Sequence, residues 1–319
     1  MTKKLISIVI PAYNEEECVD KLYDALTAVI NPITKYDFEV IIAENGSYDD
    51  TFSKLLKINQ KDPRFKIVKL TRNCGCDIGI SAGLKFAKGD AVVITYADLE
   101  DPPYLISQFL EKWEEGYKHV YGIIKARQGG FIRRMNSRIF YYLINKLTND
   151  VVPKNVSDFR LIDKQVCREI NGMSERNKFL RAMFAWLNYK SIGIPYDRNT
   201  VRAGGVSKAY TFMVISYAFK GIFSYSNIPL RVASFLGIIT SSVSFLGILY
   251  FALQYTLFMN HPPFNGFGTI ICLILLLFGI MFLLIGMLGE YIGLIYNEVR
   301  GRPLFVVDQL VGMEGKKDE

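Results

Sequence analysis

The chain has 319 residues, a formal net charge of +7, and hydrophobic residues at half of its positions. This length is enough for one sizeable domain and a smaller unit. Residues 1–230 read as a charged globular sequence, whereas residues 231–296 carry almost no charge. This favours a soluble part followed by a membrane part over a wholly soluble chain with two buried apolar helices, because the apolar runs lack a polar face. A basic balance is typical of proteins that bind nucleic acid, anionic membranes or phosphate-bearing substrates. The apolar segments favour the last two.

Short apolar runs rich in β-branched residues alternate with segments of helical spacing in the first hundred residues. We expect strands at residues 5–10, 38–43, 65–70 and 91–95, and helices at 15–30, 51–60 and 81–87. The run at 5–10 is too short for a signal peptide. Alternation of this kind indicates an α/β fold with a mostly parallel sheet. In such sheets ligands bind at the carboxyl ends of the strands.

Four polar motifs follow the predicted strands. They are PAYNEE at 11–16, ENGSYDDT at 44–51, RNCG at 72–75 with Gly79 and Gly83 after it, and YADLEDPP at 96–103. A single acidic loop is usually a solvated turn, but four motifs in order are more specific. Carboxylates at a strand's carboxyl end can hold a divalent metal together with substrate phosphates. Of the five cysteines, Cys74 and Cys76 lack the second pair that a zinc site needs, which favours free thiols.

Two long uncharged runs indicate a transmembrane hairpin, because a span needs about 20 apolar residues. The expected spans are 232–258 and 267–290, joined by a short turn without Lys or Arg. Basic residues flank the hairpin on its other side, which places both termini in the cytoplasm. Two further segments, 133–147 and 210–225, have amphipathic character. They are either interfacial helices or ordinary packed helices.

Together these motifs resemble the inverting glycosyltransferases of family 2, and most closely the branch that acts on polyprenyl phosphates. The resemblance extends to VSDFRL at 156–161, RNKFLR at 176–181, RAGGVSK at 202–208, LGEYIG at 288–293 and RGRP at 300–303. It implies a GT-A catalytic domain over residues 1–228, a two-helix membrane unit over 229–296 and a cytoplasmic tail over 297–319.

The resemblance also implies roles for individual residues. The nucleotide-binding set is Pro11, Ala12, Tyr13, Glu15, Glu44, Asn45, Asp98, Arg202 and Lys208. The acceptor-phosphate set is Arg127, Arg133, Ser137 and Arg160. Asp98 and Asp158 are the catalytic candidates. Asp158 either positions the acceptor or takes a residual proton, since a phosphate monoester with a second pKa near ~6 is already largely ionised.

The metal motif departs from the family. Relatives read Asp-Ala-Asp-Leu-Gln, whereas this chain has Tyr96 at the first position and Glu100 at the last. On an extended segment, residues i and i+2 point to one side. We therefore expect Asp98 and Glu100 to hold Mg²⁺ or Mn²⁺ against the donor diphosphate. The alternative is a degenerate site that no longer transfers sugar.

The function implied is inverting transfer of a sugar from a nucleotide-sugar donor to undecaprenyl phosphate at the cytoplasmic membrane face, for cell-envelope glycosylation. UDP is the expected nucleotide. Glu44 and Asn45 stand where relatives usually have two Asp residues, which leaves GDP or another nucleotide as the alternative. The alternative is a non-catalytic relative that binds donor or lipid. A processive polysaccharide synthase is disfavoured because the chain has no Gln-x-x-Arg-Trp motif. Nucleic acid is not an expected partner. A homo-tetramer is expected from the resemblance.

Overall fold

The computed structural model describes residues 3–125, 156–176, 178–199 and 267–313, with separate positions between 230 and 253. The chain divides into two compact units. One combines Met1–Val214 with Arg302–Glu319, and the other is Ile215–Gly301. The predicted amphipathic segments 133–147 and 210–225 lie outside the described residues.

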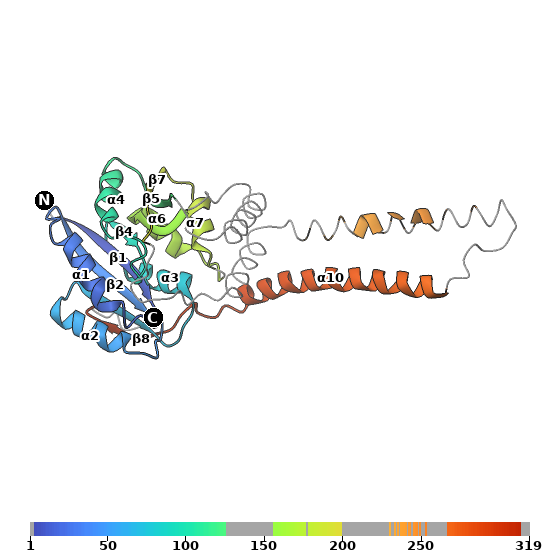
Figure 1. The fold of residues 1–319 in the computed structure, drawn as a ribbon, viewed down its shortest axis with the longest axis horizontal. Coiled ribbons are helices and arrows are strands. Elements are labelled where there is room, and N and C mark those ends of the chain that lie inside the picture. Colours follow the sequence, from blue (N-terminus) through green and yellow to red (C-terminus); the bar gives the residue numbers. More distant parts are fainter. Residues whose placement is uncertain are drawn as a thin grey trace. The chain divides into compact units, whose positions relative to one another are not determined.

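The first unit is built on a sheet to which the described residues contribute eight strands (Figure 1). In chain order these are β1 (Lys4–Ala12), β2 (Tyr36–Glu44), β3 (Phe65–Leu70), β4 (Ala91–Ile94), β5 (His119–Ile124), β6 (Val156–Asp163), β7 (Ser191–Tyr196) and β8 (Val307–Val311). Their order across the sheet is β7-β5-β6-β4-β1-β2-β3-β8. The pairs among β1, β2, β3 and β4 are parallel, and β6 runs antiparallel to both β4 and β5. The predicted mostly parallel α/β sheet is confirmed.

Helices cover both faces of the sheet. They are α1 (Val19–Ile30), α2 (Thr51–Lys61), α3 (Cys76–Phe86), α4 (Leu105–Glu114), α6 (Lys164–Gly172) and α7 (Leu180–Trp186). Alternate β1 residues such as Ile8 join one buried cluster with Leu26 of α1, Leu55 of α2 and Phe109 of α4. Such period-two alternation between faces is inherent to strands. The burial on both faces explains why these strands read as continuous apolar runs.

The opposite face receives α3, which begins five residues earlier than the predicted helix at 81–87. Its glycines explain the difference, because they allow close packing rather than breaking the helix. A Cβ on Gly83 would lie 2.4 Å from Val9 Cγ1, and one on Gly79 would lie 2.7 Å from Asn45 Nδ2. The helix starts after Gly75, whose φ of +93° is ordinary only for glycine.

Residues 297–319, for which the sequence predicted a cytoplasmic tail, include a strand. This strand, β8, pairs antiparallel with β3 and forms an edge of the sheet. Lys69 and Asp308 form an ion pair of 3.0 Å between these strands, and Thr71 N donates to Val306 O at 3.1 Å. The chain therefore returns to the first unit after passing through the second.

In the second unit, the long helix α10 (Phe267–Val299) stands out (Figure 1). Within the described residues, its segment Leu276–Val299 is the one helix long and apolar enough to cross a membrane, with a mean hydropathy of 2.0 and no burial. The helix continues past residue 290, where the sequence predicted its end. At about 1.5 Å per residue it is longer than the roughly 30 Å hydrocarbon core. The described positions between 230 and 253 are helical, and Phe235 and Ile238 are exposed.

Candidate active site

The acidic turn follows β4 at the carboxyl edge of the parallel strands, where the sequence predicted ligand chemistry. It comprises residues 98–101, and its Asp98 Oδ1 accepts a hydrogen bond from Glu100 N at 3.2 Å. Leu99 adopts a left-handed conformation with φ of +55°. Non-glycine residues rarely adopt this conformation without support from their surroundings. The turn therefore has a specific, stabilised shape rather than that of a solvated loop.

Asp158 on β6 lies beside this turn and is held by several donors. Tyr96 Oη donates to Asp158 Oδ2 at 2.8 Å, and Arg181 of α7 binds both carboxylate oxygens at 2.7 and 2.6 Å. Burial alone would raise the pKa of Asp158, but the Arg181 guanidinium, with Arg160 and Tyr96, outweighs it and holds the pKa well below its usual range. Asp158 is therefore a stable carboxylate, which suits a positioning role better than proton uptake.

Tyr96 remains a neutral donor in this cluster. Burial, and then the negative charge of Asp158, raise the pKa of Tyr96 well above its ordinary value. A phenol can donate a hydrogen bond where a second carboxylate would repel Asp158. Tyr96 therefore connects the strand end before the acidic turn to β6 without adding charge.

Arg160, predicted as a contact for the acceptor phosphate, is only 2% exposed. Its guanidinium lies 4.6 Å from the ring centre of Phe184, donates to Ser157 O at 3.0 Å and approaches Asp158 Oδ1 at 3.4 Å. These contacts make it a buried partner of Asp158. Arg127, Arg133, Ser137, Arg202 and Lys208 lie outside the described residues.

Six of the predicted nucleotide-binding residues lie at the ends of β1 and β2, namely Pro11, Ala12, Tyr13, Glu15, Glu44 and Asn45. Both loops are joined, because Asn14 N donates to Ser47 Oγ and Glu15 N donates to Thr51 Oγ1, at 3.0 and 2.8 Å. Pro11 and Ala12 end β1. Tyr13 packs edge-on against Tyr48, with ring centres 6.5 Å apart. The first and second motifs thus form one continuous surface.

Glu44 and Asn45 supply buried acceptors beside this surface. Glu44 is fully buried; its Oε1 accepts from Ser47 N at 2.5 Å, while its Oε2 has no hydrogen-bond partner among the described residues. Asn45 Nδ2 donates to Gly75 O at 3.3 Å, and its Oδ1 likewise lacks a partner in the described part of the chain. Buried acceptors are normally satisfied. These two oxygens can therefore accept further hydrogen bonds.

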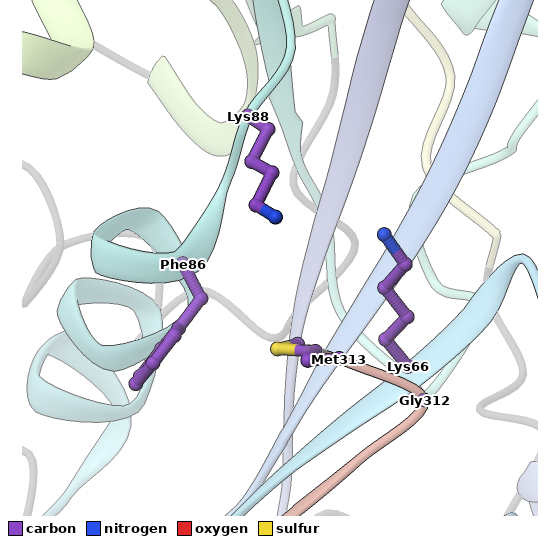
Figure 2. Close-up of a pocket in the computed structure, with 5 residues that line it drawn as sticks. All are labelled: Lys66, Phe86, Lys88, Gly312 and Met313. Atoms are coloured by element: carbon purple, nitrogen blue, oxygen red, sulfur yellow. The ribbon is translucent and has the colours of Figure 1, made fainter. Parts of the chain in front are cut away.

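A cavity of about 220 Å³ lies elsewhere, between the start of β3, the end of α3 and the segment after β8. Figure 2 shows Lys66, Phe86, Lys88, Gly312 and Met313 around it. Lys66 Nζ pairs with the buried Glu39 at 2.7 Å. None of the predicted site residues lines this cavity, so it belongs to the junction with the C-terminal strand.

Sequence reasoning missed two residues that the structure brings to the site. Arg181 ends the RNKFLR segment, so its position in a family motif was the available signal. Arg198, just after β7, pairs with Glu100 and Asp101, both at 3.1 Å, and no sequence pattern marked it. Glu100, predicted as a metal ligand beside Asp98, is therefore engaged by a guanidinium in this structure.

This fold and the grouped motifs define a glycosyltransferase of the GT-A type. The model of the family described as Glycosyl transferase family 2 matches residues 7–170, about half of the chain, and the chain belongs to that family.

Relatives extend the similarity over nearly the whole chain. An uncharacterised glycosyltransferase of Synechocystis sp. is 38% identical over 97% of this chain and 96% of its own length. The SfII prophage-derived bactoprenol glucosyl transferase of Shigella flexneri is 34% identical over 95% of this chain and 97% of its own length.

Solved structures show the same fold at lower identity. A structure of glucosyl-3-phosphoglycerate synthase from Mycobacterium tuberculosis covers 69% of this chain and 78% of its own, with a TM-score of 0.51 and 15% identity. Another structure of that enzyme, in complex with Mn²⁺, UDP and phosphoglyceric acid, has a TM-score of 0.50 and 17% identity over 69% of this chain and 76% of its own.

Proposed function

We propose that this enzyme transfers a sugar from a nucleotide-sugar donor to a polyprenyl phosphate, with inversion, at the cytoplasmic face of the membrane. The observation that carries the proposal is the joint arrangement of the first two motifs, the acidic turn and Asp158 at one edge of the sheet. Similarity to bactoprenol glucosyl transferases over 95% of the chain supports the lipid acceptor. Bactoprenol is undecaprenol, so undecaprenyl phosphate is the proposed acceptor.

The proposed donor is a UDP-sugar bound along the ends of β1 and β2. Pro11, Ala12 and Tyr13 line one side of the nucleoside, and the buried acceptor oxygens of Glu44 and Asn45 receive its N–H or hydroxyl donors. Uracil has one imide N–H, which can donate to the Glu44 oxygen that has no partner among the described residues. Arg202 and Lys208 complete the proposed set at the diphosphate.

A divalent metal fits this site only in company with the donor. The described residues contain no cluster of three or more His, Cys, Asp or Glu able to hold one. Mg²⁺ is often held by one or two carboxylates together with substrate phosphates, and this arrangement suits Asp98 in the acidic turn. A bound Mg²⁺ or Mn²⁺ would stabilise negative charge on the leaving diphosphate. Glu100 contributes directly only if its ion pair with Arg198 opens.

The chain's own residues then act by orientation and charge. The acceptor phosphate is largely ionised at neutral pH, since its second pKa is near ~6. A strong general base is therefore unnecessary, in agreement with the low pKa of Asp158. Asp158 instead fixes the two guanidinium groups of Arg160 and Arg181 beside the acidic turn. Fixed charges of this kind stabilise anionic groups at little reorganisation cost.

The sheet topology supports the two-span hairpin. Strands β7 and β8 belong to one sheet, so Tyr196 and Val307 lie on the same side of any membrane. The chain between them must cross an even number of times. If α10 crosses the membrane once, a second crossing lies between residues 197 and 275. The uncharged run 232–258 is long enough for this second span.

A transfer assay tests the proposal. Full-length protein in detergent is incubated with undecaprenyl phosphate and radiolabelled nucleotide sugars, in Mg²⁺, Mn²⁺ or EDTA. We expect a labelled lipid with one donor, and its loss in EDTA. The competing function is a non-catalytic protein that binds donor or lipid, which the departures at Asn45 and Tyr96 favour. Intact folding and lipid binding without any labelled product would establish that alternative.

A further inference from the structure

The acidic turn needs support from outside its own residues. Leu99 has a φ of +55°, and a non-glycine residue in this region is strained unless its surroundings stabilise it. The turn also contains three carboxylates, Asp98, Glu100 and Asp101, whose mutual repulsion opposes a compact shape. A compact turn with this composition requires hydrogen-bond donors and positive charge from another segment.

The short segment after β7 supplies the hydrogen bonds. Asn199 N donates to Glu100 O at 2.9 Å, and Asn199 Nδ2 donates to Leu99 O at 2.8 Å. One asparagine thus binds the carbonyls of two consecutive residues of the turn, the left-handed Leu99 and Glu100 after it. This double contact fixes the backbone conformation directly after Asp98.

The same segment supplies the positive charge. Arg198 Nη1 lies 3.1 Å from Glu100 Oε2, and Arg198 Nε donates to Asp101 Oδ1 at 3.1 Å. Asp101 is itself anchored, because its buried carboxylate accepts from Ser157 Oγ at 3.1 Å and from Tyr196 Oη. Arg198 therefore bridges one half-exposed and one buried carboxylate of the turn.

We infer that Arg198 and Asn199 are positioning residues that hold Asp98 in its metal-binding place, and that Glu100 acts as the partner of Arg198 rather than as a metal ligand. This inference rests on the proposed function, since it concerns the same metal and donor. The negative charge of Glu100 is then matched by the guanidinium of Arg198. It also makes the residues following β7 part of the metal site without contact to the metal.

Hydrogen exchange in the metal-free, donor-free protein tests the structural half. The variants are Arg198→Gln, Glu100→Gln and the double variant, with Lys125→Gln as the matched control, because Lys125 forms a neighbouring exposed ion pair with Asp197. We expect the Asn199 amide to exchange about tenfold faster in the first three and at the wild-type rate in the control. Unchanged exchange in Arg198→Gln would overturn the inference.

Mn²⁺ binding, followed by the spectroscopic signal of free Mn²⁺ with UDP present, tests the functional half. Each single variant should bind Mn²⁺ about fivefold more weakly, and the double variant no more weakly than the worse single one, because both substitutions break one contact. Loss of binding in Glu100→Gln but not in Arg198→Gln would make Glu100 a ligand and overturn the inference. A lower unfolding temperature with unchanged Mn²⁺ affinity would also overturn it, by reducing the contact to a structural one.

The two measurements separate this inference from the proposed function. The exchange experiment needs neither metal nor donor, so it decides whether the contacts hold the turn even if the wild-type protein transfers no sugar. The wild type could transfer no sugar while the Asn199 amide still exchanges faster in the Arg198 and Glu100 variants. That result would reject the proposed function and leave the positioning contacts in place.

Discussion

The Tyr96 hydroxyl donates a hydrogen bond of 2.8 Å to Asp158 Oδ2 and so joins the strand end after β4 to the middle of β6. The two residues are 62 positions apart in the chain. Tyr96 occupies the position where the resembling family carries the first Asp of its metal motif. In this chain, therefore, a neutral donor replaces a carboxylate directly beside the ion pair of Asp158 with Arg181.

Substitution of Tyr96 by Asp should make the stability of the protein more dependent on metal. An ionised carboxylate at this position cannot donate a hydrogen bond to Asp158 and repels it. The lost hydrogen bond and the repulsion together should lower the free energy of unfolding by about 1–3 kcal/mol. Mn²⁺ with UDP should restore part of this loss. Thermal unfolding with and without Mn²⁺ and UDP measures both effects.

Tyr96→Phe is the control for that experiment, because it removes the hydrogen bond without adding charge. It should lower the unfolding temperature slightly and respond to Mn²⁺ and UDP as the wild type does. An equal response of Tyr96→Asp and the wild type would show that position 96 does not face the metal.

Asp158→Asn should destabilise the protein by about 3 kcal/mol, since it leaves the guanidinium groups of Arg160 and Arg181 beside a neutral amide. The low pKa of Asp158 fixes the pH dependence. A carboxyl whose pKa is lower in the folded state stabilises it above the unfolded pKa, and this contribution is lost as pH falls through the folded value. The difference between wild type and variant should therefore be constant from about pH 5 to 8 and shrink only below about pH 4.

The same low pKa predicts the shape of the activity profile. The Asp158 carboxylate stays ionised throughout the neutral range. The wild type and Asp158→Asn should therefore show the same shape in a plot of kcat/KM against pH, whatever the difference in their absolute rates. A limb between about pH 5 and 8 that disappears in Asp158→Asn would identify Asp158 as a proton acceptor and contradict the positioning role.

His119→Phe should remove an acid sensitivity of folding. His119 is 8% exposed and lies between the rings of Tyr121 and Phe184, with centres at 5.1 and 5.4 Å. Its Nε2 has no hydrogen-bond partner in the described part of the chain. Burial, and then the charge of Arg160, hold the pKa of His119 well below its ordinary value. A phenylalanine fits the same apolar surroundings without a polar atom.

The sign follows from proton binding. Below about pH 6.5 the unfolded chain binds a proton at His119 more readily than the folded protein does, so stability falls as the solution is acidified. The wild type should lose up to about 1.4 kcal/mol per pH unit relative to His119→Phe until the folded pKa is reached. Denaturant unfolding from pH 8 to 5 measures this difference. A gap that does not change with pH would show that His119 takes up a proton in the folded state.

The sequence predicted the strands β1 to β4 and the edge at which the site lies, because buried parallel strands leave continuous apolar runs followed by polar loops. It could not reveal that Tyr96 faces Asp158. That contact depends on β4 and β6 pairing antiparallel, with Ile94 opposite Arg160. Residues 95–155, which include α4 and β5, separate the two strands, so no short hairpin turn indicates their pairing. The ion pair of Arg198 with Glu100 was hidden for the same reason, since it joins distant segments through the sheet.

The C-terminal strand was also missed, although residues 307–311 are mostly apolar. A short edge strand has a weak sequence pattern. Its partner β3 lies far earlier in the chain, with the whole second unit between the two strands in sequence. Helix α3 was predicted too short, because Gly79 and Gly83 weaken a helical pattern unless their close contacts with the sheet are known.

The pairing of β8 with β3 leads to the last prediction, which concerns membrane topology. Alkaline phosphatase, which is active only outside the cytoplasm, should be active when fused after His261 and inactive when fused after Gly312. A cysteine pair at Val68 and Leu310, which lie opposite each other, should form a disulfide when isolated membranes are treated with a thiol oxidant, whereas Val68 with Gln309 should not. Activity of the fusion after Gly312 would place β8 outside the cytoplasm. Because a strand cannot join a sheet through a bilayer, that result together with the disulfide would place the whole sheet outside and contradict the cytoplasmic orientation. Activity of both fusions would mean that the chain makes no single crossing between His261 and Gly312 and would contradict α10 as a membrane span.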